Sequence, residues 1–267
     1  MPVIQSRQNP KVKLARRLLT RQGRHKHGLF LVEGLRHVGA ALEAGAEITY
    51  LLWAPDRLTS AFGRRLVAEA EKRGPVYAIS GEVLDSLSPR EHSQGLIAVL
   101  PIPTTPLESL VPDAQPWVVA ITAPQNPGNI GTVLRTMDAV GADALILLEG
   151  GADPYHPAAV RASMGALFWL PVVKTSWEAF LVWAQQHGYH LYGSSARGTA
   201  AYTEVDYTKP AVLLLGSERE GLSPAQREAC ETIVTLPMEG HGTSLNLAVA
   251  AGVLLYAMKT RLAHPPG

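Results

Sequence analysis

The chain is poor in residues that build covalent or metal-centred frameworks. It has a single cysteine, Cys230, among 267 residues, which excludes a disulfide framework and every cysteine-rich metal site. Its nine histidines are scattered, and the pair His25 and His27 has no second cluster to complete a ligand set. We therefore predict that the protein works without a metal.

Long hydrophobic runs are also missing. The longest, Leu247 to Met258, is shorter than the roughly 20 residues that span a bilayer. The N-terminal stretch MPVIQSRQ lacks the apolar core of a signal peptide. Hydrophobic residues at 46% and charged residues at 18% are typical of a compact globular protein. We expect a soluble, cytoplasmic protein with no membrane partner.

Acidic residues are absent before Glu33, whereas the remainder of the chain holds 16 basic and 23 acidic residues. A basic arm on an acidic body favours a polyanion partner, because arm cations can displace counterions from a phosphate backbone. The charges alone fit a solvated helix, or a tail folded onto the body, equally well. The arm carries eight basic residues: Arg7, Lys11, Lys13, Arg16, Arg17, Arg21, Arg24 and Lys26.

The alternation of apolar strands and helical patterns divides the chain into two predicted domains and a linker. Residues 1–100 read as an α/β domain with the basic arm, in which strands near 30–34, 48–54, 76–80 and 94–100 alternate with helices. The stretch PIPTTPLESLVPDAQP, 101–116, has five prolines and is the predicted linker. Residues 117–267 form the second domain.

The second domain is predicted to be an open, mainly parallel sheet with helices on both faces. Sheets of this kind bind ligands beyond the carboxyl ends of their strands. The expected strands are 117–122, 144–148, 170–173, 190–195, 211–216 and 232–237, and the expected helices are 130–140, 157–166, 176–187, a short one after Ser223, and one from about Ser244 to Leu262.

The first of three strand-end loops is NPGNIGTVLRT, 126–136. Its glycines let the backbone turn tightly beside a ligand, and the helix that follows favours anions at its N-terminus. Arg135 lies about 140° around the helix from the core-facing Ile130, so it should point away from the core. A phosphate site, a nucleotide site and an ordinary glycine turn with an asparagine cap remain open. The Walker and dinucleotide fingerprints are absent.

The other two loops are LLLGSEREGLSP, 213–224, and the start of LPMEGHGTSLNLAVAAGVLLYAM, 236–258. We interpret Glu218 as a positioning carboxylate, with a plain turn capped by Ser223 as the alternative. Capping by Ser244 would explain that serine and leave Asn246 unexplained, because a buried amide needs partners. The final helix is apolar on every side, which is typical of a large core or an interface.

In order and spacing, these loops resemble the three motifs of the SpoU/TrmH family of RNA ribose 2′-O-methyltransferases, within the SPOUT superfamily. The segment RASMGALFWLPV, 161–172, is similar to the family's segment between motifs one and two. The N-terminal SRQNPKVKLARRLL…GLFLVEGLRHV resembles the substrate-binding domain of members that modify ribosomal RNA, a domain similar to small ribosomal and kink-turn-binding proteins. The resemblance covers nearly the whole chain.

The resemblance implies an α/β fold in which the sheet of residues 117–267 is tied in a deep trefoil knot, S-adenosylmethionine as cofactor, and a homodimer that completes each active site across its interface. One departure is Ala248, where many members carry a second serine. Matched by motif, the implied catalytic residues are Asn129, Arg135, Glu218, Ser244 and Asn246, the cofactor-binding residues are Ser195, Gly216, Leu236, Met238, Ser244 and Leu245, and the RNA-binding residues are Arg7, Lys11, Lys13, Arg16, Arg17, Arg24, Arg135 and Arg161.

The resemblance therefore implies methyl transfer to a ribose 2′-hydroxyl, and large-subunit ribosomal RNA is the substrate we expect. Arg135 is expected to orient the RNA phosphate and lower the hydroxyl's pKa as a fixed cation, because a guanidinium is a poor base. The alternatives are transfer RNA as substrate, a catalytically silent RNA-binding or ribosome-assembly protein on the same scaffold, and a nucleotide-dependent oxidoreductase. The last lacks its glycine fingerprint.

Overall fold

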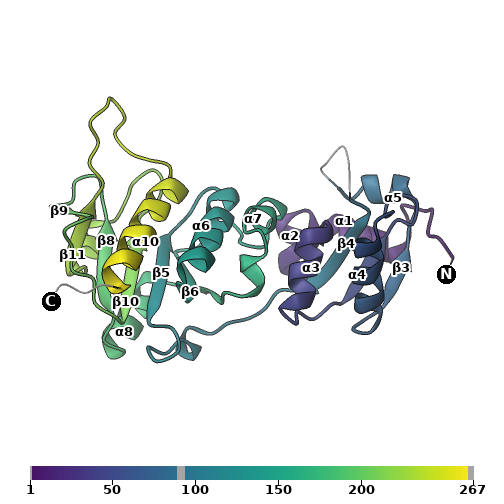
Figure 1. The fold of residues 1–267 in the computed structure, drawn as a ribbon, viewed down its shortest axis with the longest axis horizontal. Coiled ribbons are helices and arrows are strands. Elements are labelled where there is room, and N and C mark those ends of the chain that lie inside the picture. The colour runs from purple at the N-terminus through teal and green to yellow at the C-terminus, as the bar shows by residue number, and fades with distance from the viewer. Residues whose placement is uncertain (1, 89–93, 264–267) are drawn as a thin grey trace. The chain divides into compact units, whose positions relative to one another are not determined.

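The computed structural model describes residues 2–88 and 94–263, and the chain divides into two compact units (Figure 1). The first unit comprises Met1–Pro103 together with Asp153–Phe168, and the second comprises Thr104–Ala152 together with Trp169–Gly267. The sequence placed all of 117–267 in one domain, whereas the structure groups the segment 153–168 with the N-terminal residues. The chain therefore passes between the units three times.

The first unit is built on a four-stranded mixed sheet in the order β1-β4-β2-β3. Strand β4 is antiparallel to both β1 and β2, and β2 is parallel to β3. Its elements are α1 (Pro10–Leu18), α2 (Arg21–His27), β1 (Leu29–Glu33), α3 (Leu35–Glu43), β2 (Tyr50–Trp53), α4 (Ala61–Glu71), β3 (Val76–Ala78), α5 (Gly81–Asp85), β4 (Leu96–Pro101), α7 (Pro157–Ala162) and η2 (Ala166–Phe168).

The basic arm forms the first two helices. Asn9 caps α1 by accepting a hydrogen bond from the backbone of Lys11, and the apolar stripe of α1 is buried at Val12, Ala15 and Leu18. Helix α2 ends at Gly28, whose φ of 62° is in the left-handed region that favours glycine. The arm is thus an ordered part of the first unit rather than a free tail.

Side chains of the first unit hold the segment 153–168 in place. The Arg24 guanidinium donates to the Asp153 carboxylate at 2.7 Å, and the Phe30 and Tyr155 rings lie 4.9 Å apart between centroids. The His37 Nε2 atom lies 3.2 Å from the backbone oxygen of Arg161. These contacts join residues more than a hundred positions apart, which local sequence patterns do not reveal.

The second unit contains a seven-stranded sheet in the order β7-β6-β5-β10-β8-β11-β9, and every pair in it is parallel. The parallel α/β sheet expected from the sequence is therefore confirmed. The elements are η1 (Leu107–Ser109), β5 (Trp117–Thr122), α6 (Pro127–Val140), β6 (Ala144–Leu148), β7 (Val172–Thr175), α8 (Trp177–Gln186), β8 (His190–Ser194), β9 (Ala200–Ala201), β10 (Ala211–Leu215), α9 (Pro224–Glu228), β11 (Thr232–Thr235) and α10 (Leu247–Ala263).

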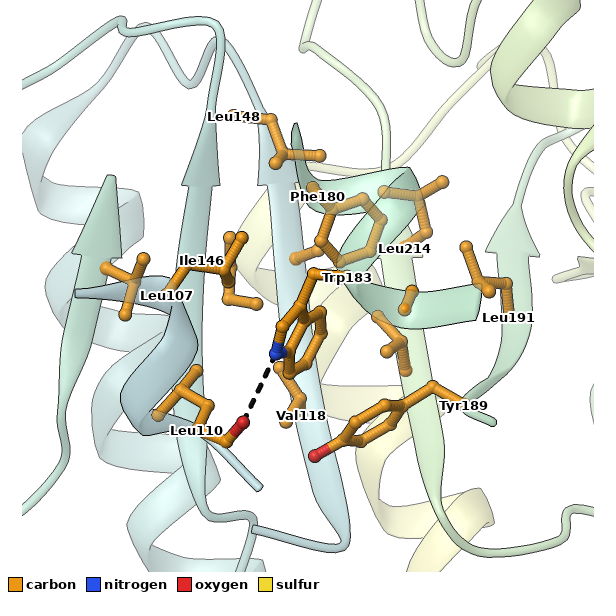
Figure 2. Close-up of a cluster of buried hydrophobic side chains, with 14 of the residues drawn as sticks. Leu107, Leu110, Val118, Ile146, Leu148, Phe180, Trp183, Tyr189, Leu191 and Leu214 are labelled. Atoms are coloured by element: carbon orange, nitrogen blue, oxygen red, sulfur yellow. Dashed lines mark hydrogen bonds between the residues drawn. The ribbon is translucent and has the colours of Figure 1, made fainter. Parts of the chain in front are cut away.

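A buried cluster covers one face of this sheet (Figure 2). Phe180 and Trp183 of α8 pack on it together with Tyr189 and Leu214. The Trp183 indole N–H donates to the backbone oxygen of Leu110 at 3.2 Å, drawn as the dashed line in Figure 2. Part of the proline-rich connector is therefore packed into the second unit.

The strand order decides where the three loops lie. Strand β10 pairs with β5 on one side and β8 on the other, although more than 85 residues separate β5 from β10 in sequence. Because the strands are parallel, the segments that follow β5, β10 and β8 leave the same edge of the sheet. Helix α10 packs along α6 and brings the third loop to that edge (Figure 1).

Candidate functional site

The Glu218 carboxylate lies at the centre of the first two loops. It accepts hydrogen bonds from the backbone N–H groups of Gln125 and Asn126, at 2.9 and 3.3 Å, and from the side-chain amide of Asn129 at 3.2 Å. A carboxylate that accepts three N–H groups holds the loop that donates them. This geometry fits the positioning interpretation of Glu218.

Asn129 and Asn246 connect the third loop to the first. The Asn246 amide donates to the side-chain oxygen of Asn129 at 3.2 Å, and the Asn246 side-chain oxygen accepts from the backbone N–H of Ala248 at 2.9 Å. The sequence expectation that the last helix begins at about Ser244 is wrong, because α10 begins at Leu247 and Asn246 caps it. Asn246 thus has the partners that its position requires.

The second loop closes into a tight turn after β10. Ser217 and Gly221 exchange backbone hydrogen bonds at 3.2 and 3.0 Å, and Gly221 has a φ of 68°. At Gly216 a Cβ atom would lie 2.1 Å from the backbone carbon of Gly221, so only glycine fits. Glycine is required at position 216 because the backbone of Gly221 fills the space that a side chain would need.

This turn forms one wall of a cavity of about 520 Å³. The side chains around it are mixed, with leucines and a methionine beside serine hydroxyls and charged groups. All six residues that the resemblance assigned to the cofactor line it: Ser195, Gly216, Leu236, Met238, Ser244 and Leu245. Glu218 also borders the cavity, so the hydrogen-bonded chain of Glu218, Asn129 and Asn246 begins at its edge.

Arg135 lies apart from this cavity. It is exposed on α6, on the face away from the core, as its position on the helix predicts. The described residues that line the cavity do not include it. Within one chain, therefore, the structure brings together four of the five motif-matched catalytic residues, Asn129, Glu218, Ser244 and Asn246, at or beside the cavity.

Helix α10 buries only one of its faces within the chain. Ala251, Leu254 and Met258 are fully buried. On the opposite face, Val249 and Tyr256 remain more than half exposed and form a stripe with Val253 at the spacing of one helix face. The sequence of α10 is apolar on every side of the helix, but the rest of this chain buries only one side of it.

The basic residues of the first unit differ in their accessibility. Arg7, Lys13 and Arg17 are exposed. Lys11 is half-buried, with its ammonium 5.3 Å from the centre of the Tyr50 ring. The half-buried residues also include Arg16, which donates to Ser86, and Arg161.

Arg24 is buried rather than displayed for RNA. Its side chain is 1% exposed, and its guanidinium bonds to Asp153 and to the backbone oxygens of Leu18 and Leu19. The prediction that Arg24 binds RNA is therefore not supported, because a buried and paired guanidinium is not accessible to a polyanion. Arg24 instead stabilises the first unit.

Three further arginines border the cavity that sequence reasoning did not single out: Arg197, Arg219 and Arg227. Arg219 lies inside the second loop, beside Glu218, and could have been found there. Arg197 follows β8, whereas Arg227 lies in α9. In neither place does the local sequence pattern distinguish the arginine from a solvent-facing residue.

Other chemistries find little support in the described part of the chain. Burial raises the pKa of the Cys230 thiol to about 12, and this thiol donates to the backbone oxygen of Gln226. A thiol with such a pKa is not a thiolate nucleophile at neutral pH. Among the described residues no cluster of three metal ligands occurs, and no described helix is long and apolar enough to cross a membrane.

Two family models match the chain. Residues 116–256 match the SpoU rRNA Methylase family, and residues 9–98 match the MRM3-like substrate binding domain. The first match contains all three loops and the cavity. The second covers the basic helices and most of the first unit.

Related proteins match over almost their full length. The 23S rRNA (guanosine(2553)-2′-O)-methyltransferase RlmP of Bacillus subtilis is 30% identical, over 97% of this chain and 100% of the relative. The 23S rRNA (uridine(2479)-2′-O)-methyltransferase of Streptomyces viridochromogenes is 34% identical, over 91% and 86%. The crystal structure of an AdoMet-bound rRNA methyltransferase from Sinorhizobium meliloti superimposes with a TM-score of 0.89 at 31% identity, covering 98% of both chains.

Proposed function

The chain belongs to the SpoU rRNA Methylase family, and from this membership we propose that it transfers a methyl group from S-adenosylmethionine to a ribose 2′-hydroxyl of ribosomal RNA. The observation that carries the proposal is the hydrogen-bonded chain from Glu218 through Asn129 to Asn246, which joins all three motif loops beside one cavity. Both named relatives act on 23S rRNA, which supports large-subunit RNA as the substrate.

The cavity fits the proposed cofactor in size and chemistry. Its volume of about 520 Å³ lies in the range of small-molecule sites. Leu236 and Leu245 offer apolar surface for an adenine ring, Ser195 and Ser244 offer hydroxyls, and the Glu218 carboxylate offers negative charge near a cation. S-adenosylmethionine supplies a methyl group on a sulfonium that is already a good leaving group, so the protein's task is to position two reactants.

The residues around the cavity divide this task. Glu218 and Asn129 fix the first loop against the second, which keeps the cavity wall rigid. Arg135 binds the RNA phosphate beside the target ribose, and its positive charge favours loss of the 2′-hydroxyl proton. The proton passes to phosphate or water, since a guanidinium retains its own protons.

A homodimer completes this site. Arg135 is exposed and outside its own cavity, and the stripe of Val249, Val253 and Tyr256 is uncovered on α10, which packs along the helix that carries Arg135. A second copy seated on the stripe would cover it and bring Arg135 of one chain toward the cavity of the other. The deep trefoil knot belongs to the same proposal, and membership of the family is what supports it.

The N-terminal residues 1–100 bind the RNA substrate in this proposal. The match to a substrate binding domain and the exposed cations Arg7, Lys13 and Arg17 support this role. In this proposal the protein acts in the cytoplasm. Transfer RNA is the alternative substrate, and a silent assembly factor is the alternative function.

Mapping 2′-O-methylation in cellular RNA, with and without the protein, tests the function directly. One ribosomal position that loses its methyl group, and regains it in vitro with purified protein and S-adenosylmethionine, would support the proposal. Donor binding without methylation of any cellular RNA would favour the silent scaffold. Arg135→Lys keeps the charge and loses the planar fork, so we expect slower methyl transfer. A wild-type rate would contradict the role of the fork.

A further inference from the structure

A second groove lies on the other side of the turn that follows β10. Its volume is about 540 Å³, and it is bordered by the ends of β5 and β6 and by the starts of α8 and α9. The two hollows share residues of one tight turn, Ser217 and Gly221 among them. A molecule in the second groove would therefore be separated from the cofactor by a single turn of chain.

Backbone strain is concentrated at this groove. Ala123 and Glu149 line it with φ angles of 41° and 58°, values that side-chain-bearing residues rarely adopt. They follow the adjacent strands β5 and β6 directly, and the N–H of Ala123 donates to the backbone oxygen of Leu148 at 2.8 Å. Such strain tends to persist at ligand sites. Parallel sheets bind ligands at this edge.

Trp177 is an aromatic residue in the lining of the groove. The residue is half-buried, and its ring packs against Phe180 with centroids 5.6 Å apart. Its backbone N–H donates to the Glu149 carboxylate at 2.5 Å, which fixes the start of α8. A rigid, half-exposed ring in a groove is the platform on which RNA-binding proteins stack unpaired bases.

The charged residues of the groove favour a nucleobase over a phosphate group as its ligand. Glu149, Glu178 and Glu220 line it, with Arg227 as the counter-charge. Carboxylates repel a phosphate group, whereas they accept hydrogen bonds from the amino groups of bases. Arg227 borders both hollows and can bind a backbone phosphate between them.

We propose that this groove binds an unpaired nucleobase that bears an exocyclic amino group. The base stacks on Trp177 and donates to Glu178, which is exposed and follows Trp177 in the chain. The inference rests on the proposed function, since it assigns the groove to a base of the RNA substrate. It makes the groove a determinant of which RNA sequence is accepted.

Binding of single-stranded oligocytidine and oligouridine of equal length, measured by fluorescence anisotropy without cofactor, tests the groove. Cytosine carries the amino group and uracil lacks it. We expect the wild type to prefer oligocytidine, and Trp177→Leu to weaken its binding about tenfold, since a leucine side chain offers no ring on which a base can stack. Trp177→Phe keeps a ring and should bind within about threefold of the wild type. Both variants retain apolar bulk against Phe180.

Glu178→Met keeps the length of the side chain and removes its acceptor oxygens, so it should remove the preference for oligocytidine and leave oligouridine binding unchanged. Affinity for S-adenosylmethionine, measured by calorimetry, should be equal in all four proteins. The inference is overturned when the wild type shows no base preference, when Trp177→Leu binds like the wild type, or when Glu178→Met keeps the preference. Failure of the proposed function reads differently: the wild type would transfer no methyl group, whatever its binding to oligonucleotides.

Discussion

The side-chain amide of Asn246 donates a hydrogen bond to the side-chain oxygen of Asn129 at 3.2 Å, across 117 positions of sequence. The amide group of Asn129 in turn donates to Glu218 at 3.2 Å. One asparagine therefore serves as acceptor for the third loop and donor for the second, while it lies on the first. The side-chain amide of asparagine carries both an acceptor oxygen and N–H donors, so this one residue can make both hydrogen bonds.

Asn129→Ala should disconnect the three loops. Asn246 loses its acceptor and Glu218 loses a donor, so we expect the free energy of unfolding to fall by about 1–3 kcal/mol. Methyl transfer should fall at least about tenfold, because misplaced loops misplace the reactants. Urea denaturation and single-turnover methylation measure the two effects. Thr132→Ala, an exposed position of the same helix, is the control and should change neither. Unchanged methylation in Asn129→Ala would contradict the proposed role.

The chain's periodicity was sufficient to predict most of the elements. Apolar runs of five or six residues mark the buried strands β5 and β10, and glycine and asparagine mark the loops that follow them. The parallel sheet follows from this alternation. The order of the strands does not, because the pairing of β10 with β5 and β8 depends on contacts between distant residues.

The least predictable feature is the position of charged residues in three dimensions. Arg17 and Arg24 belong to one basic run, yet the first is exposed and the second is buried against Asp153. Asp153 lies 129 positions away, so no local pattern pairs it with Arg24. The same limit applies to Arg227, which contributes to two hollows but follows an ordinary capping sequence.

Arg24→Met and Arg17→Met should therefore affect different properties, the first stability and the second RNA binding. Both replacements keep an unbranched apolar stem and remove the charge. Loss of the buried guanidinium in Arg24→Met leaves the Asp153 carboxylate without this partner and should lower the free energy of unfolding by about 3–5 kcal/mol. Arg17→Met should leave stability within about 0.5 kcal/mol and weaken RNA binding instead. Denaturation curves and salt-dependent RNA binding separate the two. Equal stability of both variants would contradict a stabilising role of the buried Arg24 side chain.

Gly216→Ala should destroy the cofactor cavity. A Cβ atom there would lie 2.1 Å from the backbone carbon of Gly221, so the turn that forms the wall has to open. We expect affinity for S-adenosylmethionine, measured by calorimetry, to fall at least about tenfold. Gly240→Ala is the matched control, because nothing lies within 4 Å of the added atom and the residue precedes the same cavity segment. Similar loss in both variants would show that loop flexibility, rather than the tight turn, governs binding.

Val253→Asp should separate the proposed dimer. A carboxylate in the middle of the stripe on α10 would be buried without a partner when a second copy covers it. We expect a folded monomer by light scattering, with methyl transfer reduced at least about tenfold because Arg135 no longer reaches a second cavity. Val182→Asp places the same charge on an exposed valine of α8 and should remain dimeric and active. A monomeric wild type would remove the basis for this prediction.

His156 makes the stability of the first unit depend on pH. Its Nδ1 atom accepts a hydrogen bond from the backbone of Ala158, and burial, with the nearby Arg24 charge, lowers the pKa of the ring below its usual 6.5. Folding thus favours the neutral ring. The contribution of His156 to stability is complete above about pH 6.5 and is lost as the pH falls through the lowered pKa.

His156→Asn keeps an acceptor for the Ala158 N–H and removes the titration. Urea denaturation at about pH 7.5 and about pH 5 compares the two proteins on either side of the ordinary histidine range. We expect the wild type to lose more stability than the variant between these values, since only the wild type has to keep a ring at this site neutral against protonation. The two proteins should unfold with equal dependence on urea concentration, because the replacement exposes no additional surface. An equal loss of stability in both would mean that other groups govern the acid sensitivity, and that the His156 cap is indifferent to protonation.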